Sequence, residues 1–301
     1  MFNPRDATKN MSFYSRIRSY YNFFRIYVDF FLMFQKRYQN FMSVLINVSR
    51  RRYPIFAILR TGHRLMLDDY RQLYSNLLNL DRDFENDLVK VDGLKFYGGV
   101  SNTDSIWAYT AKEYEFLPVK DKVVIDIGAN IGDSAIYFVK NGARKVIAIE
   151  HDTKLCQFAR KNITLNGFSE RIELINSICT SIDALAQGTG DTSLVSLQSI
   201  IDQCTTIPSI LKIDCEGCEY DVILSASPTT LLNFTHIQIE YHYGYKNLKR
   251  KLEGEGFQVK VTERSYFISF FGNNNIKFFN NVGKQMRMGV VYSGMLYASR
   301  Q

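Results

Sequence analysis

Acidic residues and cysteines alternate in the stretch LKIDCEGCEYDVI, where Asp214, Cys215, Glu216, Cys218 and Glu219 follow an apolar run. Carboxylates at such a position can hold a polar substrate or move its protons. The C-x-x-C spacing is also found in zinc sites and in redox motifs. A zinc site would require two more ligands at a suitable spacing, and the sequence has no second cysteine pair of this kind. The surrounding elements decide which chemistry applies.

A loop with two glycines and two nearby acids is the second candidate site. In VVIDIGANIGDSAIYF, Gly128 and Gly132 allow the backbone to approach a ligand, and the amides that begin the next helix favour an anionic group. Glu150 lies 22 residues after Gly128, and its carboxylate can accept both hydroxyls of a ribose. A dinucleotide-binding loop would read G-x-G-x-x-G. This loop reads G-A-N-I-G after Asp126, which suits S-adenosylmethionine, a ligand with an ammonium group and no pyrophosphate. A tight turn without a ligand is the alternative.

Both sites require a scaffold that brings separate loops together. Short apolar segments alternate with helical ones, and the predicted strands are KVVIDI (122–127), KVIAIE (145–150), RIELIN (171–176), SILKID (209–214), HIQIE (236–240), FQVKV (257–261) and GVVYSGMLYAS (289–299). This alternation predicts an α/β fold with a doubly wound, parallel sheet covered by helices on both faces. Ligands of such sheets bind at the carboxyl ends of strands, so we expect the two sites at one edge. Upstream, Asp92-Gly93 predicts a two-residue hairpin.

Three motifs in this region resemble a known family. DIGANIGDSAIYF, LKIDCEGCEYDVI and IQIEYHYG together are similar to the FkbM-type methyltransferases, over about residues 85–300. The resemblance implies a class I methyltransferase (Rossmann-like) sheet of about seven strands, whose last strand runs antiparallel, with S-adenosylmethionine as the cofactor. It divides the chain into a basic, aromatic helical extension, residues 1–84, and a methyltransferase domain, residues 85–301.

The resemblance also implies which residues contact the cofactor. These are Asp126, Gly128, Asn130, Gly132 and Glu150, and, at the adenine rim past the third strand, Asn176 and Ser177. Asp214, Glu216 and Glu219 would face the cofactor's methyl group at the end of the fourth strand. Members of the family commonly carry small or apolar residues at the positions of Cys215 and Cys218. We therefore expect these cysteines to pack as small hydrophobic side chains, with neither a redox nor a zinc role.

The catalytic residues are predicted at the ends of the fourth and fifth strands. Methyl transfer is an in-line displacement, and a hydroxyl acceptor must also lose a proton, so a base within hydrogen-bond reach is expected. The predicted catalytic residues are Asp214 and Glu216, with Glu240 and His242 on the same side of the next strand. His242 can be the base or a structural histidine. A divalent ion among these four residues has no decisive ligand pattern, so we predict no metal site.

The excess positive charge lies in the N-terminal part of the chain. The 301 residues carry a net charge of +7, but residues 1–66 alone have 12 Lys and Arg against 2 acids. Residues 12–50 contain no Gly or Pro, which predicts one or two long helices, and their polar side chains form a narrow stripe on an aromatic surface: Arg18, Asn22, Arg25, Asp29 and Lys36. This segment can pack on the catalytic domain or lie on an anionic membrane surface. Nucleic acid is a less favoured partner.

Cysteine content and hydropathy limit the location. Five cysteines in a chain of this size do not suggest a secreted disulfide framework. The most apolar segment, residues 20–34, is shorter than the roughly 20 residues that span a bilayer. We therefore expect a cytoplasmic protein that contacts membranes peripherally, if at all, through its N-terminal segment.

The predicted function is methyl transfer to a hydroxyl group of a small molecule or glycan, an acceptor class that the resemblance implies. An RNA methyltransferase that uses the basic N-terminus is a second hypothesis, although no N-P-P-Y-like motif follows the fourth strand and no RNA-binding module is evident. A third hypothesis is a non-catalytic, membrane-associated adaptor that has kept the fold. Cofactor binding would separate this adaptor from both enzymes.

Overall fold

Two compact units make up the chain. The computed structural model describes residues 31–50, 52–68, 80–102, 106–110, 113–181, 193–204, 209–263 and 294–300, together with Val28, Gln72, Leu73 and Asn76. The described residues up to Leu80 belong to the first unit, and those from Asp81 onward belong to the second. The domain division expected after residue 84 stays a prediction.

Helices and a short hairpin form the first unit. Residues 31–37 are helical, α3 is Phe41–Ser49, and the strands β1 (Ile55–Ile58) and β2 (Arg64–Leu67) pair antiparallel. Asn40 ties the start of α3 to the hairpin, because its Nδ2 donates to Phe56 O at 2.9 Å and its Oδ1 accepts from Ile58 N at 2.8 Å. These bonds satisfy backbone groups on the free side of β1, which no neighbouring strand pairs in the part of the chain described.

The helices of this unit were expected, whereas the hairpin was not. The helical residues 31–37 and α3 agree with the long helical segment expected over residues 12–50. Of the expected polar stripe, Lys36 is exposed, and its other members lie outside the described residues: Arg18, Asn22, Arg25 and Asp29. Among the residues that are described, no helix combines the length and the hydropathy needed to cross a membrane.

A small antiparallel sheet begins the second unit. Its strands are β3 (Asp81–Asp83), β4 (Leu88–Val91) and β5 (Leu94–Tyr97). The hairpin predicted at Asp92-Gly93 is confirmed, and both turn residues have positive φ, 51° and 78°, as a type I′ turn requires. Asn162 of α7 (Thr153–Leu165) accepts from Tyr97 N at 2.8 Å and donates to Tyr97 O at 3.0 Å, which holds this sheet to the helix.

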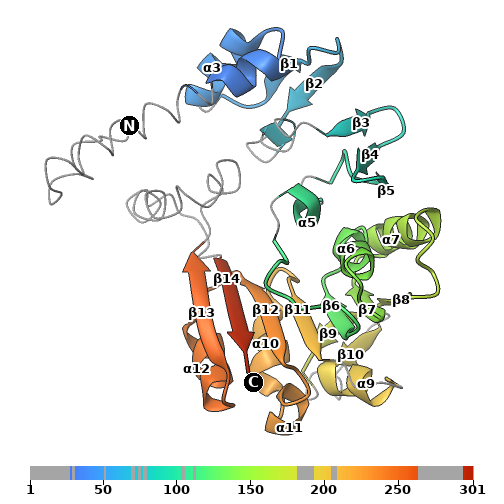
Figure 1. Cartoon of the computed structure of the whole chain (residues 1–301). Helices are drawn as coiled ribbons and strands as arrows, with labels where there is room; N and C mark the ends of the chain where they lie inside the picture. Colours follow the sequence, from blue (N-terminus) through green and yellow to red (C-terminus); the bar gives the residue numbers. More distant parts are fainter. Residues whose placement is uncertain are drawn as a thin grey trace, which may run out of the picture. The chain divides into compact units, whose positions relative to one another are not determined.

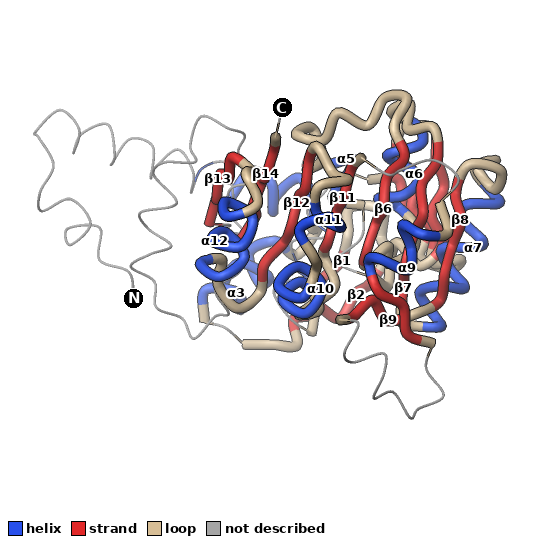
Figure 2. The backbone as a smooth tube through the Cα atoms, turned by 90° about the horizontal axis from the view of Figure 1, so that it is seen from below, coloured by secondary structure: helices blue, strands red, loops and turns tan. Residues whose placement is uncertain are grey.

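A seven-stranded sheet is the centre of the second unit (Figures 1 and 2). Its strands are β6 (Val123–Ile127), β7 (Lys145–Glu150), β8 (Ile172–Asn176), β11 (Ile210–Ile213), β12 (His236–Tyr241), β13 (Gln258–Glu263) and β14 (Gly294–Ser299). Their order is β13-β14-β12-β11-β6-β7-β8; β14 is antiparallel to both neighbours, and all pairs from β12 to β8 are parallel. The predicted α/β, doubly wound class I methyltransferase fold is confirmed, including its antiparallel last strand.

The two faces of this sheet differ in polarity. One face packs in a continuous apolar cluster against α9 (Leu197–Asp202), α10 (Glu219–Ser225), α11 (Pro228–Leu231) and α12 (Lys246–Gly254). Each apolar side chain buried there contributes about 1.5–3 kcal/mol. The alternate residues of the central strands face the other way, toward α6 (Asp133–Lys140), and include buried polar side chains: Asp126, Lys212, Gln238 and Glu240. Three of them, Asp126, Lys212 and Glu240, are each the last residue but one of their strand, near its carboxyl end.

Candidate active site

Lys212 and Asp126 form a buried ion pair in the middle of the sheet. They face each other across β11 and β6, with Lys212 Nζ 3.0 Å from Asp126 Oδ1, and neither side chain is more than 3% exposed. Ser134 Oγ of α6 donates to the other carboxylate oxygen at 2.6 Å. Burial would lower the pKa of Lys212, but Asp126 and other carboxylates raise it above its ordinary value. The carboxylate expected to face a cofactor ammonium group is thus already paired, and its cofactor role stays a prediction.

Gly128 and Gly132 lie where a side chain would meet the protein itself. Gly128 has a φ of 80°, and a Cβ on it would be 1.7 Å from the carbonyl oxygen of Asp214. Gly132 has a φ of 83°, and its Cβ would be 3.2 Å from Ala159 Cα of α7. Lys212 Nζ donates to Gly128 O at 2.7 Å. The sequence suggested that the backbone at Gly128 approaches a ligand. In the structure it approaches the backbone at the end of β11.

Glu150 ends β7 with a buried carboxylate that holds two backbone amides. Its Oε2 accepts from Asn130 N and its Oε1 accepts from Asp152 N, both at 2.8 Å. His151 Nδ1 lies 3.2 Å from the same Oε1. Asn130 has a φ of 52°, and its Oδ1 accepts a hydrogen bond from Asn102. Because each carboxylate oxygen can accept more than one hydrogen bond, Glu150 is fixed in orientation and can still receive ribose hydroxyls.

Asn176 ends β8, beside Glu150 in the register of the sheet, and Ser177 follows it. Asn176 Nδ2 donates to the carbonyl oxygens of Glu150 at 2.8 Å and of His151 at 3.1 Å. Ser177 is buried, and its Oγ donates to Ser193 Oγ at 2.8 Å, just before the parallel pair of β9 (Ile178–Thr180) and β10 (Leu194–Ser196). Asn176 therefore supports the backbone around Glu150, and the expected place of both residues at the adenine rim stays a prediction.

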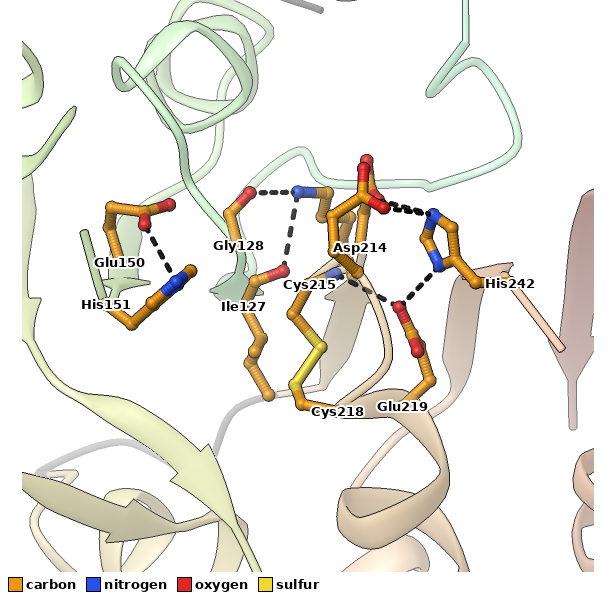
Figure 3. The surroundings of a disulfide bond; sticks show 11 residues. Ile127, Gly128, Glu150, His151, Asp214, Cys215, Cys218, Glu219 and His242 are labelled. Atoms are coloured by element: carbon orange, nitrogen blue, oxygen red, sulfur yellow. Dashed lines mark hydrogen bonds and ion pairs between the residues drawn. A yellow bond between two sulfur atoms is a disulfide. The ribbon is translucent and has the colours of Figure 1, made fainter. Parts of the chain in front are cut away.

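Three carboxylates surround His242 beyond the ends of β11 and β12 (Figure 3). Nδ1 of His242 lies 2.9 Å from Glu219 Oε1, which also accepts from Cys215 N at 3.2 Å. Nε2 lies 3.3 Å from Glu216 Oε2 and 4.0 Å from Asp214 Oδ1. We call Asp214, Glu216, Glu219 and His242 the acid–histidine group. The structure therefore brings together three of the four predicted catalytic residues.

Burial and mutual contact set the charges of the acid–histidine group. Burial would lower the pKa of His242, but its hydrogen bond with Glu219 and the nearby carboxylates raise it above the ordinary value. Burial would raise the pKa of Glu219, but the hydrogen bond and charge of His242 lower it on balance. The pKa of Asp214 is raised, chiefly by burial. These shifts make the His242 imidazole a stronger proton acceptor than free histidine.

Glu240 lies on the polar face of β12. The residues Ile237, Ile239 and Tyr241 belong to the apolar cluster on one face, so Glu240 points to the opposite face. β12 ends at Tyr241, and His242 lies in the bend that follows, where strand alternation no longer applies. Glu240 is buried. Its catalytic role stays a prediction.

Cys215 and Cys218 form a disulfide, which we did not predict (Figure 3). Glu216 and Gly217 between them both have positive φ, 58° and 131°, which turns the chain back on itself. The two Cα atoms are 5.5 Å apart, within the range for a disulfide. The expected packing is present, since both cysteines contact the apolar cluster. The covalent bond corrects the expectation that they only fill space.

Two buried charged residues near the site were missed in the sequence. Lys212 stands inside the otherwise apolar strand ILKI, and a lysine within such a run is the signal that could have revealed a buried ion pair. Asp133 follows Gly132 in the first turn of α6, and its Oδ2 accepts from Ile106 N at 2.6 Å. Burial raises the pKa of Asp133 to about 6. Lys212 lies on the polar face of the sheet, and Asp133 lies in α6, the helix that packs on this face.

Comparison with known proteins finds a family match in this region. Residues 126–259 match the family model described as the Methyltransferase FkbM domain, a span that contains Asp126, Glu150 and the acid–histidine group. Over these residues the chain is similar to this family, and we call residues 126–259 the FkbM domain. The resemblance drawn from the three sequence motifs is therefore confirmed.

Relatives of the FkbM domain match it over part of their length. "Uncharacterized protein 158B" of Sulfolobus islandicus rod-shaped virus 1 is 31% identical over 120 residues, which cover 38% of this chain and 61% of that protein. The ribosomal protein L11 methyltransferase of Escherichia coli O8 is 39% identical over 82 residues, 27% of each chain. The structure of M. capricolum TrmK with S-adenosylhomocysteine covers 61% of this chain and 65% of its own, at 14% identity and a TM-score of 0.38. The chain thus spans less than two thirds of these curated relatives.

Proposed function

We propose that the FkbM domain transfers a methyl group from S-adenosylmethionine to a hydroxyl group of a small molecule or glycan. The family match supports methyl transfer. The observation that carries the proposal is the acid–histidine group, which lies at the same carboxyl edge of the sheet as Glu150. Ligands of doubly wound sheets bind at this edge.

The residues at the ends of β6 and β7 fit the cofactor. S-adenosylmethionine, when bound, supplies a methyl group on a positively charged sulfur. Glu150 is held by two backbone amides and keeps acceptor capacity for ribose hydroxyls. We assign the remaining cofactor contacts to Asp126, Gly128, Asn130, Gly132, Asn176 and Ser177. Among these, Asp126 acts through its ion pair with Lys212, which fixes the carbonyl of Gly128.

The acid–histidine group can bind the acceptor and take its proton. Nδ1 of His242 is held by Glu219, so Nε2 is directed toward Glu216 and Asp214. A hydroxyl placed there can give its proton to Nε2 as its oxygen attacks, and Glu219 stabilises the positive imidazole that results. Glu216 is mostly exposed and can accept a hydrogen bond from a second hydroxyl of the acceptor. A polar acceptor with more than one hydroxyl fits these groups.

Cofactor binding and the fate of the methyl group test the proposal. Calorimetry with S-adenosylhomocysteine is expected to show binding that Glu150→Gln weakens by about 1–3 kcal/mol, the range for a lost buried hydrogen-bond partner. Glu173→Gln, at an exposed ion pair on β8, is the control. Labelled S-adenosylmethionine is then incubated with cell extract split into RNA, lipid–glycan and small-molecule fractions. Label confined to the RNA fraction favours the RNA methyltransferase, and binding of NAD without S-adenosylhomocysteine overturns the cofactor assignment.

We also propose that the first unit contacts an anionic membrane surface. Residues 31–67 contain no Asp or Glu and seven Lys or Arg. Bulky apolar side chains in this segment are between 40% and 53% exposed: Phe31, Leu32, Met42, Ile46, Phe56 and Met66. Phe56 and Met66 are paired across the hairpin. Apolar side chains among cations suit the headgroup region of an anionic bilayer.

Flotation with vesicles tests this contact. The full chain is expected to float with anionic vesicles and not with neutral ones. Phe56→Ser combined with Met66→Ser should reduce flotation, whereas Leu165→Ser, at an exposed position of α7, should not. Equal flotation with both kinds of vesicle, or no effect of the paired substitution, contradicts the proposal.

A further inference from the structure

His242 has one ring nitrogen in a hydrogen bond and directs the other at two carboxylates. Its side chain is 10% exposed, and Nδ1 is engaged with Glu219 Oε1 at 2.9 Å. Nε2 makes no hydrogen bond to any residue within the described part of the chain, and it lies 3.3 Å from Glu216 Oε2 and 4.0 Å from Asp214 Oδ1. The side chain is thus fixed at one nitrogen and directs the other at two carboxylates (Figure 3).

We propose that Asp214, Glu216 and His242 bind a divalent cation. One ligand atom from each of these residues lies within 4.8 Å of the other two. The inference deepens the proposed function, and it rests on that function only for the role given to the cation. It replaces our expectation from the sequence that the chain has no metal site.

The surroundings of Nε2 favour a cation there. With its Nδ1 proton directed to Glu219, a neutral imidazole presents a lone pair at Nε2, and both neighbouring groups are acceptors as well. Three carboxylates also crowd one histidine, so the group carries excess negative charge. Lys212, the nearest buried cation in the part of the chain described, is engaged by Asp126. A divalent ion placed there would bind the Nε2 lone pair and the two carboxylates. Its charge would also offset the excess negative charge of the group.

Glu219 has the position of a residue that orients a metal ligand. Metal-binding histidines usually donate their second ring N–H to a carboxylate, which fixes the tautomer and the ring orientation. Glu219 is fully buried, and it is held in turn by the amide of Cys215. This amide belongs to the turn that also carries Asp214 and Glu216, so one short segment supplies two ligands and the anchor of the third. Glu219 is therefore a positioning residue.

The ligand set indicates the class of cation and its role. One imidazole and two carboxylates suit Mn²⁺ or Zn²⁺ better than Mg²⁺, which prefers oxygen ligands. Three protein ligands leave coordination positions for oxygen atoms of the acceptor. A metal ion lowers the pKa of an oxygen that it binds, so the acceptor hydroxyl can ionise without a protein base. His242 then serves as a ligand, and the proton of the hydroxyl passes to water instead of to Nε2.

Titration with Mn²⁺ alone tests the site. Free Mn²⁺ is measured by electron paramagnetic resonance while the ion is added to the full chain, without cofactor or acceptor. We expect saturable binding of about one Mn²⁺ per chain, weakened at least tenfold in Glu216→Gln, in line with the roughly 10–100-fold losses seen around metal sites. Glu216 is 76% exposed, so this substitution leaves the fold intact. His236→Gln, at the opposite end of β12, is the matched control and should bind as the parent does.

The outcomes separate this inference from the proposed function. Absence of saturable Mn²⁺ binding, or equal affinity of the parent and Glu216→Gln, overturns the metal site. If S-adenosylhomocysteine still binds in calorimetry, the proposed function stands without the metal. Saturable Mn²⁺ binding that depends on Glu216, in a chain that does not bind S-adenosylhomocysteine, supports the metal site and contradicts the methyltransferase proposal.

Discussion

Replacing Lys212 by Met should destabilise the domain through the charge that it leaves behind. Asp126 is fully buried, and Lys212 is its ionic partner at 3.0 Å. Removing one partner of a buried ion pair costs about 3–5 kcal/mol, because the other charge stays in a medium that solvates it poorly. The substitution also removes the hydrogen bond to Gly128 O. With total stabilities of about 5–15 kcal/mol, such a loss leaves a chain that unfolds at much lower urea concentration.

Substitution of Asp126, alone and together with Lys212, separates the effect of the charges on stability from the effect of packing. Asp126→Asn alone leaves the Lys212 charge unpaired and should cost a similar amount. The double variant Lys212→Met with Asp126→Asn removes both charges of this pair, so its loss should fall below the sum of the single losses by at least ~2 kcal/mol. Urea unfolding followed by circular dichroism gives each free energy of unfolding. The same cycle on the exposed pair of Lys145 and Glu173 should give a coupling of about 0–1 kcal/mol.

A coupling at Lys212 and Asp126 no larger than at the exposed pair would refute this reasoning. The buried pair would then be placed for packing, and its charges would have no measurable part in stability. A single variant too unstable to fold can still be compared by introducing the second substitution, because the double variant is expected to recover folding.

Three further substitutions have expected outcomes. Burial raises the pKa of Asp133 from 3.8 to about 6, so folding stability should fall by about 2 kcal/mol as pH rises from 4 to 7, and Asp133→Asn should remove that part of the slope in urea unfolding. Gly128→Ala should lower the melting temperature markedly, whereas Gly167→Ala, also at positive φ but with open space around it, should lower it little. Cys215→Val with Cys218→Ala should unfold with about 2 kcal/mol less stability than the disulfide form, the loop-closure entropy of a four-residue ring, and unchanged stability would contradict this.

The central strands could be predicted because their pattern is local. Runs such as KVVIDI and KVIAIE are apolar throughout, since strands of a parallel sheet are buried on both faces, and their limits agree with β6 and β7 to within one residue. The Asp92-Gly93 turn was equally clear, because both residues tolerate positive φ. The β1–β2 hairpin was missed because its strands are short, and both its exposed and buried sides carry apolar residues, so no alternation marks them.

The site could be predicted in part, since it depends on contacts between distant segments. The acids of the LKIDCEGCEYDVI stretch and His242 were recognised, but the bond between His242 and Glu219 follows from the bend after β12, which the sequence does not specify. Lys212 and Asp126 pair because β11 lies next to β6, a neighbour relation set by the whole sheet. The disulfide depends on two successive residues at positive φ, and one of them, Glu216, is not a glycine.

The contact between the loop after β6 and the end of β11 joins the two halves of the site mechanically. Asp214 N donates to Ile127 O at 3.0 Å, Lys212 Nζ donates to Gly128 O, and the space beside Gly128 is too small for a methyl group. A ligand that shifts Gly128 must therefore shift the backbone of Asp214 with it. By thermodynamic linkage, any factor by which the cofactor changes the affinity for the acceptor is the factor by which the acceptor changes the affinity for the cofactor. Binding of the cofactor and of the acceptor to this domain is thus expected to show positive or negative cooperativity, and not to be independent.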